Sequence, residues 1–395
     1  MSRQSRGTAI GHRLGRRAIC ARIVIASSRA RRPPHGVSAL PPRMNSVGLG
    51  VESVPVDEAE HIGEILALFR SIQEHKDRKA TPVPRSVHPK QHGCVLAEFA
   101  VESGLPADVA HGVFREPRVY VALVRFSNSK QRDDRLPDGH GMAVKLLDVS
   151  GEQLLPERSH TTTQDFVLID HPVFFAKDVA DMVPLMRDFE RLMVGGIVAK
   201  ARTVLKGMFS RDHRFRLLRA AGAKRPDNPL EIQYWSTTPY QLGAGAMKFS
   251  LRPELHYLPA RSEKSSHKLR HAMAASLRSR DAIFDFLVQI QMDPQSMPIE
   301  DATRRWDEHL SPFIKAATLK IPAQAFDSAA QLEFGEKLSF NPWHGINAHR
   351  PLGGINRARK QLYEVMSSRR LEFNGSVSGE PTLSEAQALF PRRVP

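Results

Sequence analysis

The chain has 395 residues with a formal net charge of +15, and 25% of its residues are charged and 41% hydrophobic. This balance excludes wholesale disorder and a collagen-like or mucin-like fibre, and the two cysteines, Cys20 and Cys94, exclude a disulfide framework and a cysteine-built zinc or iron–sulfur site. No apolar run reaches the ~18 residues that a membrane-spanning helix needs, so we expect a protein without a membrane span in a reducing, cytoplasmic compartment.

The positive charge is concentrated at the N-terminus. Residues 1–43 carry ten arginines and no acid, whereas residues 44–395 have a net charge of only +5. Three interpretations stay open for this arm: a targeting peptide, a nucleic-acid-binding arm, and a disordered extension ahead of a start at Met44. An export signal is disfavoured because the only apolar stretch, 18–26, contains Arg22, and nucleic acid is disfavoured because the arm lacks aromatic residues. We favour a disordered basic arm over residues 1–50 and one folded domain over 51–395, with no nucleic acid as a partner.

Hydrophobic spacing predicts the elements of this domain in chain order. An amphipathic helix is predicted over 57–73, and a proline-punctuated loop over 80–90. The next predicted strands, bounded by turn residues, are 94–101, 119–127, 141–149 and 165–169. Strands in such close succession favour an antiparallel sheet or barrel over alternating strand–helix units.

The second half begins with a basic helical segment. Residues 176–223 have a helical pattern with a charge-rich face, which is typical of a solvated helix surface. Strand patterns return at 230–235, 246–251 and 283–292. A last helix is predicted over 354–370, after a turn-rich stretch.

Local motifs exclude several classes of enzyme. The chain has no nucleophile-elbow, P-loop or dinucleotide-binding glycine motif. His88 and His92 are four residues apart, but Pro89 makes a shared helix face doubtful and no third metal ligand has a telling spacing. Arg359 and Tyr363 share one face of the last helix. That pair is compatible with a surface cation beside a half-buried tyrosine, or with a phenolate that ligates haem iron.

Four segments, in this order, resemble the haem-containing catalases and their shorter catalase-like peroxidase relatives. They are RSVHPK (85–90), YVALVRFSNS (120–129) with DGHGMAVKLLDV (138–149), QDFVLIDHPVFFAKD (164–178) and FNPWHGINAHRPLGGINRARKQLY (340–363). The resemblance implies an α+β fold, in which helices wrap an antiparallel β-barrel and haem b is buried beside the barrel. We expect no flavodoxin-like terminal domain of the kind that large-subunit catalases carry, because only 25 residues follow Arg370.

The resemblance also implies roles for individual residues. His88 would be the acid–base on the peroxide side, with Ser127 orienting its ring and Val87 narrowing the approach to the iron. Tyr363 would ligate the iron, with Arg359 favouring its phenolate form. Further haem contacts would come from Phe174 and from three propionate-binding arginines: Arg85, Arg125 and Arg370.

One departure from the family affects the expected activity. The asparagine that donates to the bound peroxide is replaced here by Asp170, and a carboxylate donates a hydrogen bond only when protonated. The position of a haem-stacking aromatic is taken by Met182. We therefore expect a haem-dependent peroxidase or catalase-like enzyme, with hydrogen peroxide or a small organic hydroperoxide as its substrate. Whether it also uses an organic electron donor, and whether it forms a homo-oligomer, stays open.

Two alternatives remain. The first is a lipid-hydroperoxide isomerase or dehydratase, against which Val87 argues because such relatives carry threonine before the histidine. The second is an inactive carrier of haem or of an apolar ligand. Fold analogy does not separate these functions.

Overall fold

The computed structural model describes residues 48–77, 83–158, 160–254, 264–375 and 379–390, and the basic arm lies outside them. Contacts with distant parts of the chain begin within the first described residues. The Gly50 N–H donates to Gln291 Oε1 (2.8 Å), and the Glu52 carboxylate forms ion pairs with Arg350 and Arg357.

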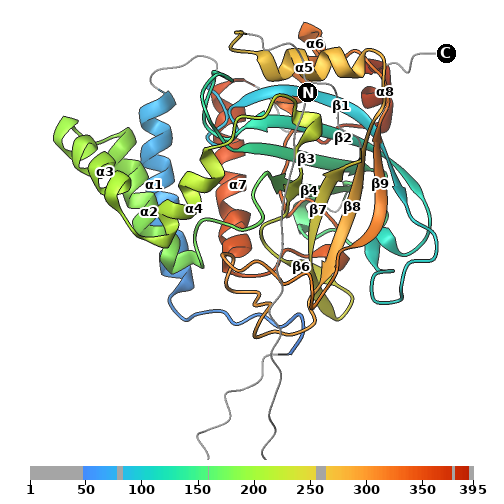
Figure 1. The fold of residues 1–395 in the computed structure, drawn as a ribbon, viewed down its shortest axis with the longest axis horizontal. Coiled ribbons are helices and arrows are strands. Elements are labelled where there is room, and N and C mark those ends of the chain that lie inside the picture. Colours follow the sequence, from blue (N-terminus) through green and yellow to red (C-terminus); the bar gives the residue numbers. More distant parts are fainter. Residues whose placement is uncertain (1–47, 78–82, 159, 255–263, 376–378, 391–395) are drawn as a thin grey trace, which may run out of the picture. The chain divides into compact units, whose positions relative to one another are not determined.

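An antiparallel barrel of eight strands forms the centre of the fold (Figure 1). Neighbours around the ring follow the order β5-β4-β3-β2-β1-β9-β8-β7, and β5 pairs again with β7, which closes the barrel, while the short β6 pairs with β7 outside the ring. The strands are β1 (Lys90–Val101), β2 (Val119–Asn128), β3 (His140–Leu147), β4 (Thr163–Ile169), β5 (Tyr234–Trp235), β6 (Tyr240–Leu242), β7 (Gly245–Pro253), β8 (Ala282–Ile290) and β9 (Ile314–Ile321).

Aromatic side chains fill the interior of the barrel. The Phe166 ring lies 4.9 Å from the Phe286 ring and 5.1 Å from the Phe249 ring, centroid to centroid. Phe99 and Phe114 pack on the same cluster, and all five side chains are almost completely buried. Small barrels are filled by side chains in this way, so any ligand site of this fold has to lie outside the barrel wall.

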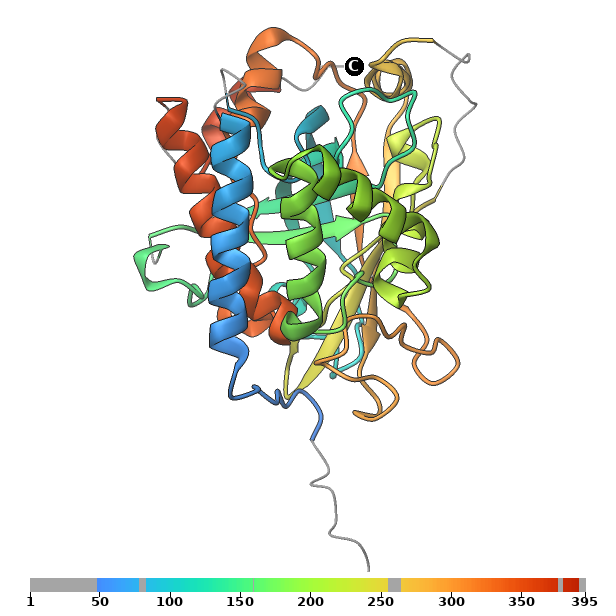
Figure 2. The ribbon, with the colours of Figure 1, turned by 90° about the vertical axis from the view of Figure 1, so that its left-hand side faces the viewer.

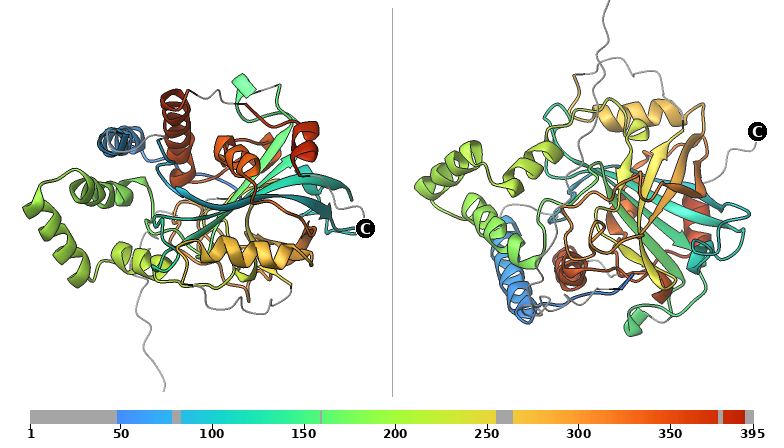
Figure 3. Two further views of the ribbon diagram at one scale, coloured as in Figure 1. Left: turned by 90° about the horizontal axis from the view of Figure 1, so that it is seen from above. Right: turned by 60° about the horizontal axis from the view of Figure 1, so that its bottom comes forward.

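Helices cover the outside of the barrel. In Figure 2, α1, α2 and α7 lie beside one another on one side, where apolar residues such as Ile65, Val183 and Leu362 form a second core. At another side α5 and α6 pack on β1 (Figure 3). The helices of the described residues are α1 (Glu58–Asp77), α2 (Val179–Met193), α3 (Ile197–Phe209), α4 (His213–Gly222), α5 (Lys268–Leu277), α6 (Ala329–Lys337), α7 (Gly354–Phe373) and α8 (Leu383–Leu389).

None of these described helices combines the length and the apolar character needed to cross a bilayer.

The predicted antiparallel barrel with helices around it is confirmed, as are the helices predicted at 57–73 and 354–370. The strand predicted over 230–235 is wrong in its first half. Pro229–Glu231 is a single helical turn, because the Asn228 side chain accepts the Leu230 N–H (3.1 Å) and caps it. The basic segment 176–223 is helical as predicted, but turns divide it into three helices.

An ion-pair cluster holds the first turn of α7 in place. The Arg357 guanidinium donates to Glu58 Oε1 at the start of α1 (2.6 Å) and to Glu300 Oε2 (2.9 Å). Charge-assisted pairs with two separate elements limit the rotation of a helix about its axis. This cluster therefore sets which face of α7, including Arg359 and Tyr363, is turned towards the barrel.

Two buried histidines are expected to make the fold sensitive to acid. His349 Nε2 accepts the Val113 N–H (3.0 Å), and burial lowers the His349 pKa from 6.5 to about 4. Burial lowers the His92 pKa to about 3. Both imidazoles are neutral in the folded protein, whereas the unfolded chain binds protons below pH 6.5. The free energy of unfolding is thus expected to fall from pH 6.5 towards 4, by up to about 1.4 kcal/mol per histidine and pH unit.

Urea unfolding at several pH values measures this dependence. His349→Gln is expected to flatten it, and His309→Gln, at an exposed position, serves as the matched control. Equal stability at neutral and acidic pH in the wild type would contradict the assignment.

Candidate active site

A cavity lies between the outer wall of the barrel and α7. It has two adjoining lobes, of about 700 Å³ and about 1100 Å³ when the open solvent at their mouths is included. Val87, His88 and Tyr363 line both lobes. All ten residues predicted from the sequence as site residues line one lobe or the other: Arg85, Val87, His88, Arg125, Ser127, Asp170, Phe174, Arg359, Tyr363 and Arg370.

The barrel wall positions the first of these side chains through strand register. On β2 and β3, Ser127 is paired with Gly141 and Arg125 with Ala143, so the four residues are close neighbours on one face of the sheet. Because the large aromatic residues occupy the inner face, this outer face is free to line the cavity.

His88 is held over this face in a strained backbone conformation. Its φ is +54°, a region that non-glycine residues rarely adopt and that is found disproportionately at functional sites. The His88 N–H donates to the Ser129 carbonyl (3.1 Å), and His88 Nδ1 lies 3.1 Å from Ser127 Oγ. When Nδ1 donates to Ser127, Nε2 is left as the acceptor nitrogen.

The electrostatic surroundings keep His88 neutral. Burial, followed by the nearby positive charge of Arg125, lowers the His88 pKa from 6.5 to about 3. A neutral imidazole with one free lone pair is able to take a proton from a bound ligand at any pH well above 3.

Gly141 leaves space for the His88 ring. A Cβ at this position would lie 2.5 Å from His88 Cε1 and 2.5 Å from Nδ1, and 3.1 Å from Ser127 Oγ. We expect Gly141→Ala to push the ring away from Ser127 and to lower turnover of peroxide, the substrate implied by the resemblance, by about 100-fold.

Peroxide consumption measured beside the melting temperature tests this expectation. Gly222→Ala is the matched control, since Gly222 also lines the cavity but its added Cβ would meet only Lys130 Nζ at 3.7 Å. Unchanged turnover in Gly141→Ala would contradict a role for the ring position.

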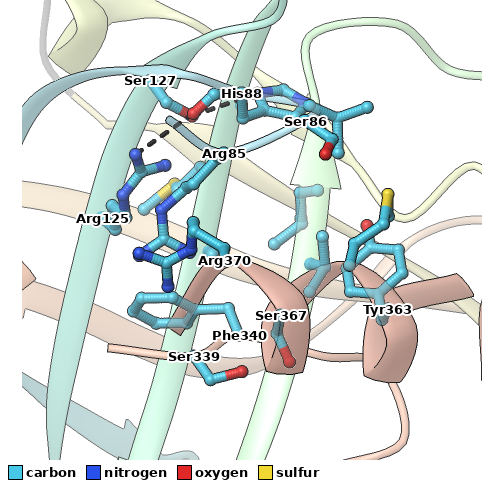
Figure 4. Close-up of a pocket in the computed structure, with 17 residues that line it drawn as sticks. Arg85, Ser86, His88, Arg125, Ser127, Ser339, Phe340, Tyr363, Ser367 and Arg370 are labelled. Atoms are coloured by element: carbon cyan, nitrogen blue, oxygen red, sulfur yellow. Dashed lines mark hydrogen bonds between the residues drawn. The ribbon is translucent and has the colours of Figure 1, made fainter. Parts of the chain in front are cut away.

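Three arginines converge at the smaller lobe (Figure 4). Arg125 Nη2 donates to the His88 carbonyl (3.2 Å), Arg85 donates to the Leu338 carbonyl (2.6 Å), and Arg370 donates to the Glu336 carbonyl (2.9 Å). The carboxylate of Glu336 lies 3.5 Å from Arg85 Nε and 3.4 Å from Arg125 Nη2. In the described part of the chain it is the one carboxylate paired with this group.

These contacts leave the lobe with an excess of two positive charges. Burial and the repulsion from Arg125 lower the Arg85 pKa well below its usual value, and burial also lowers that of Arg370. The buried Arg370 Nη2 has no hydrogen-bond partner among the described residues. Buried guanidinium groups with spare donors are costly unless anions pair with them. The lobe is thus built for a ligand with two negative charges.

Tyr363 lies on α7, across the cavity from the loop of His88 (Figure 4). Four residues before it, Arg359 Nη1 donates to Thr238 Oγ1 and to Asn356 Oδ1, both at 3.3 Å. The Arg359 guanidinium also stacks over the Phe174 ring at 5.2 Å. No described carboxylate pairs with Arg359, and the hydrogen bonds of its guanidinium do not include the Tyr363 phenol.

Asp170 lines the larger lobe, but its carboxylate is not isolated. Asp170 Oδ2 lies 2.8 Å from His140 Nδ1, and Oδ1 lies 3.8 Å from Lys224 Nζ. Asp170 Oδ1 is nevertheless buried without a hydrogen-bond partner in the described structure. His140 is therefore a lining residue that the sequence motifs did not single out, and Lys224 is a partner of Asp170 that they did not single out either. His140 stands between two glycines, and this setting was its only sequence signal.

Two further residues, Met182 and Thr237, line the larger lobe, and His92 lies outside the cavity. Met182 lines the larger lobe, where the family resemblance implies an aromatic residue. Thr237, also in this lobe, has a φ of +62°, which is unusual for a β-branched residue. His92 is buried away from the cavity, with Nε2 2.8 Å from Asn128 Oδ1, so it does not form a metal pair with His88. The described residues contain no cluster of three metal-ligating side chains of the His, Cys, Asp and Glu types.

The fold with these features is similar to solved catalase structures. A fungal catalase has a TM-score of 0.56 and 16% identity, covering 75% of this chain and 61% of the catalase. A bacterial catalase has a TM-score of 0.51 and 16% identity, covering 84% and 64%. Catalase A from Saccharomyces cerevisiae has a TM-score of 0.54 and 15% identity, covering 85% and 69%.

These likenesses establish the fold of this chain as that of the catalases, an antiparallel barrel with helices around it. The chain spans less than two thirds of the length of the first two structures. The sequence matches no protein-family model and no curated protein. What the chain does is therefore argued from the chemistry of its own cavity.

Proposed function

We propose that this protein is a haem-dependent, catalase-like peroxidase that cleaves hydrogen peroxide or small organic hydroperoxides. One observation carries the proposal. A neutral histidine, His88, and a tyrosine, Tyr363, line the same cavity, and a group of arginines with two unbalanced positive charges lies at one of its ends. The catalase fold, shared at 15–16% identity, supports the same class of chemistry.

The residues fit haem b in charge and in ligand type. Its two propionates would neutralise the excess charge left by Arg85, Arg125 and Arg370 after pairing with Glu336, and would accept from the unpartnered Arg370 Nη2. The Tyr363 oxygen is of the type that ligates haem iron in catalase. Val87 and Phe174 supply apolar surface for the ring system.

Haem, when bound, supplies a redox-active iron for cleavage of the peroxide bond. His88 takes the proton of the peroxide on Nε2 and returns it to the leaving oxygen, so that water or an alcohol departs instead of an anion. Ser127 holds the imidazole in the tautomer that leaves Nε2 free. The fixed positive charge of Arg359 lies on the same helix face as Tyr363 and favours an anionic ligand there.

The larger lobe favours one second candidate, a lipid-hydroperoxide isomerase or dehydratase. Apolar residues from four helices and a loop line this lobe, and they would give an acyl chain room: Phe69, Phe175, Met182, Leu218, Leu362 and Met366. Product analysis separates the two candidates. The isomerase consumes a polyunsaturated fatty-acid hydroperoxide without an electron donor, whereas the peroxidase oxidises an aromatic donor.

Titration of the purified protein with haem tests the proposal. We expect one haem per chain, a Soret band characteristic of tyrosinate ligation, and weaker binding in Arg370→Ala. Arg252→Ala, an exposed arginine on β7, is the matched control. A protein that binds no haem, or binds it equally well without Arg370, would contradict the proposed function.

Asp170→Asn is expected to raise oxygen evolution from hydrogen peroxide by roughly tenfold, the value of one added hydrogen bond of about 1.4 kcal/mol. The reason is that an amide can donate a hydrogen bond into the cavity from the position where Asp170 Oδ1 has no hydrogen-bond partner.

The gain is measured with an oxygen electrode. Asp188→Asn is the matched control, because Asp188 is a buried carboxylate paired with Lys206 and Arg191 outside the cavity. No gain in Asp170→Asn would point to a substrate other than hydrogen peroxide.

A further inference from the structure

Helix α3 presents an apolar surface that no described part of the chain covers. Its six large apolar side chains are between 50% and 86% exposed, and they are about a third of all exposed large apolar side chains in the described structure. Single exposed apolar residues are ordinary, but a contiguous group marks a surface for binding. The six are Ile197, Val198, Val204, Leu205, Met208 and Phe209.

The orientation of α3 is the reverse of that of an ordinary surface helix. At 3.6 residues per turn the six apolar residues fall on one side, while the opposite side carries Ala199, Thr203 and Gly207. Thr203 is buried, and Gly207 packs against the Phe215 ring. The small residues of the helix thus face its neighbours α2 and α4, and its apolar side faces outwards. Figures 1 and 3 show α3 at the periphery of the fold, beside α2. Solvation of a charged face, predicted for this segment from the sequence, does not account for that apolar side.

Unpaired cations border the apolar side. Residues 196–224 contain eight basic residues and one acid, Asp212, and Asp212 is already paired with Arg214. Among the described ion pairs none involves the side chains of Lys200, Arg202 or Arg216, and the last two are exposed. Two acids of α2 that reach this segment are paired as well: Asp188 with Arg191 and Lys206, and Asp181 with His213 and Arg214. The surface therefore combines apolar side chains with a net positive rim.

We propose that α3 and the start of α4 dock on the surface of an anionic lipid bilayer. The apolar side of α3 enters the boundary between head groups and acyl chains, while the long side chains of Lys200, Arg202 and Arg216 reach the lipid phosphates. This inference does not depend on haem or on the proposed reaction. Helix α4 connects this surface to the cavity, because its start belongs to the docking surface while Leu218 and Gly222, towards its end, line the larger lobe.

Charge and composition favour a bilayer over other occupants. A second copy of the chain, docked about a two-fold axis, would bring two basic rims together, and like charges repel. Nucleic acid would use the cations but not the aliphatic side chains, since bases stack on aromatic rings. An anionic bilayer complements both parts of the surface at once.

Vesicle flotation of the full chain tests the docking. We expect binding to phosphatidylcholine vesicles with about 30% phosphatidylglycerol, and much weaker binding to pure phosphatidylcholine. The triple change Lys200→Glu, Arg202→Glu, Arg216→Glu is expected to weaken binding by about 100-fold, and Leu205→Ser with Met208→Ser to a similar degree. Val119→Ser with Leu310→Ser, at two exposed positions elsewhere, is the matched control. Since the basic N-terminal arm is present in every variant, differences between variants report on α3.

A local probe separates docking of α3 from attraction of the arm. Phe209→Trp places an indole at the exposed end of α3, and its emission should shift to the blue and be quenched by lipids brominated in their acyl chains. Unchanged emission with anionic vesicles, or equal binding by all variants, would overturn the proposal. If the chain does not bind vesicles but dimerises through Leu205 and Met208, the proposal is overturned, and the occupant of this surface is a second copy of the chain.

Discussion

Replacing Tyr363 by Phe is expected to lower haem affinity by at least about 100-fold and to change the absorption spectrum of any haem that still binds. The substitution removes the one oxygen on α7 that the proposed function assigns to the iron. The fold should persist, because the ring remains and α7 is held by Arg357 with Glu58 and Glu300. Haem titration followed by absorption and electron paramagnetic resonance spectra measures both effects.

Tyr120→Phe is the matched control for this prediction. Tyr120 lies on β2 beneath the Arg118 guanidinium, outside the walls of both lobes. A Tyr363→Phe protein with an unchanged spectrum would remove Tyr363 as the iron ligand. If neither the wild type nor the Tyr363→Phe variant binds haem, the assignment of haem as the cofactor is wrong.

Replacing His88 by Gln is expected to slow peroxide cleavage by 10²- to 10⁴-fold (about the usual worth of general acid–base catalysis) with little effect on haem binding. Glutamine has a comparable reach, but its amide does not take up a proton. In the wild type, the His88 pKa of about 3 means that the base is in its active form over the whole neutral range. The rate should therefore stay flat from pH 8 down to about 4 and fall only at lower pH.

The measurement is the stopped-flow rate of peroxide cleavage over this pH range, compared between the wild type, His88→Gln and Ser127→Ala. Ser127→Ala should cost less than His88→Gln, because it loosens the ring without removing the base. A rate that is unaffected by His88→Gln would assign the proton transfer to another group in the cavity, such as His140, which also lines the larger lobe.

The sequence contains most of the architecture because period-2 and period-3.6 patterns are local. Spacing and turn residues alone predict the helices that begin at Glu58 and Gly354. They also predict the strand that ends at Asn128 and the strand that begins at His140. Strand β9 was not predicted from the sequence, because Lys315 and Lys320 interrupt its apolar pattern. Both lysines pair on the barrel surface, with Asp285 (2.8 Å) and Asp281 (2.9 Å).

The site was predictable only in part, because its members are brought together by tertiary contacts. Arg85, Arg125 and Arg370 were found through a family resemblance, but the carboxylate that links two of them, Glu336, is on a helix without any motif. The same holds for Lys224, which approaches Asp170 from the end of α4. The outward apolar side of α3 was hidden for another reason: a helical pattern gives the relative positions of its faces, and tertiary packing decides which face points inwards.

The aromatic residues that fill the barrel bear on the order in which the protein folds and binds its ligand. Because the rings of Phe99, Phe114, Phe166, Phe249 and Phe286 pack against one another inside the barrel, its central core is filled by the chain's own side chains. The cavity on its outer wall is then a receptor that exists before its occupant arrives. For the haem that we propose as this occupant, we expect the chain to fold before the cofactor is supplied and to become active when the cofactor binds.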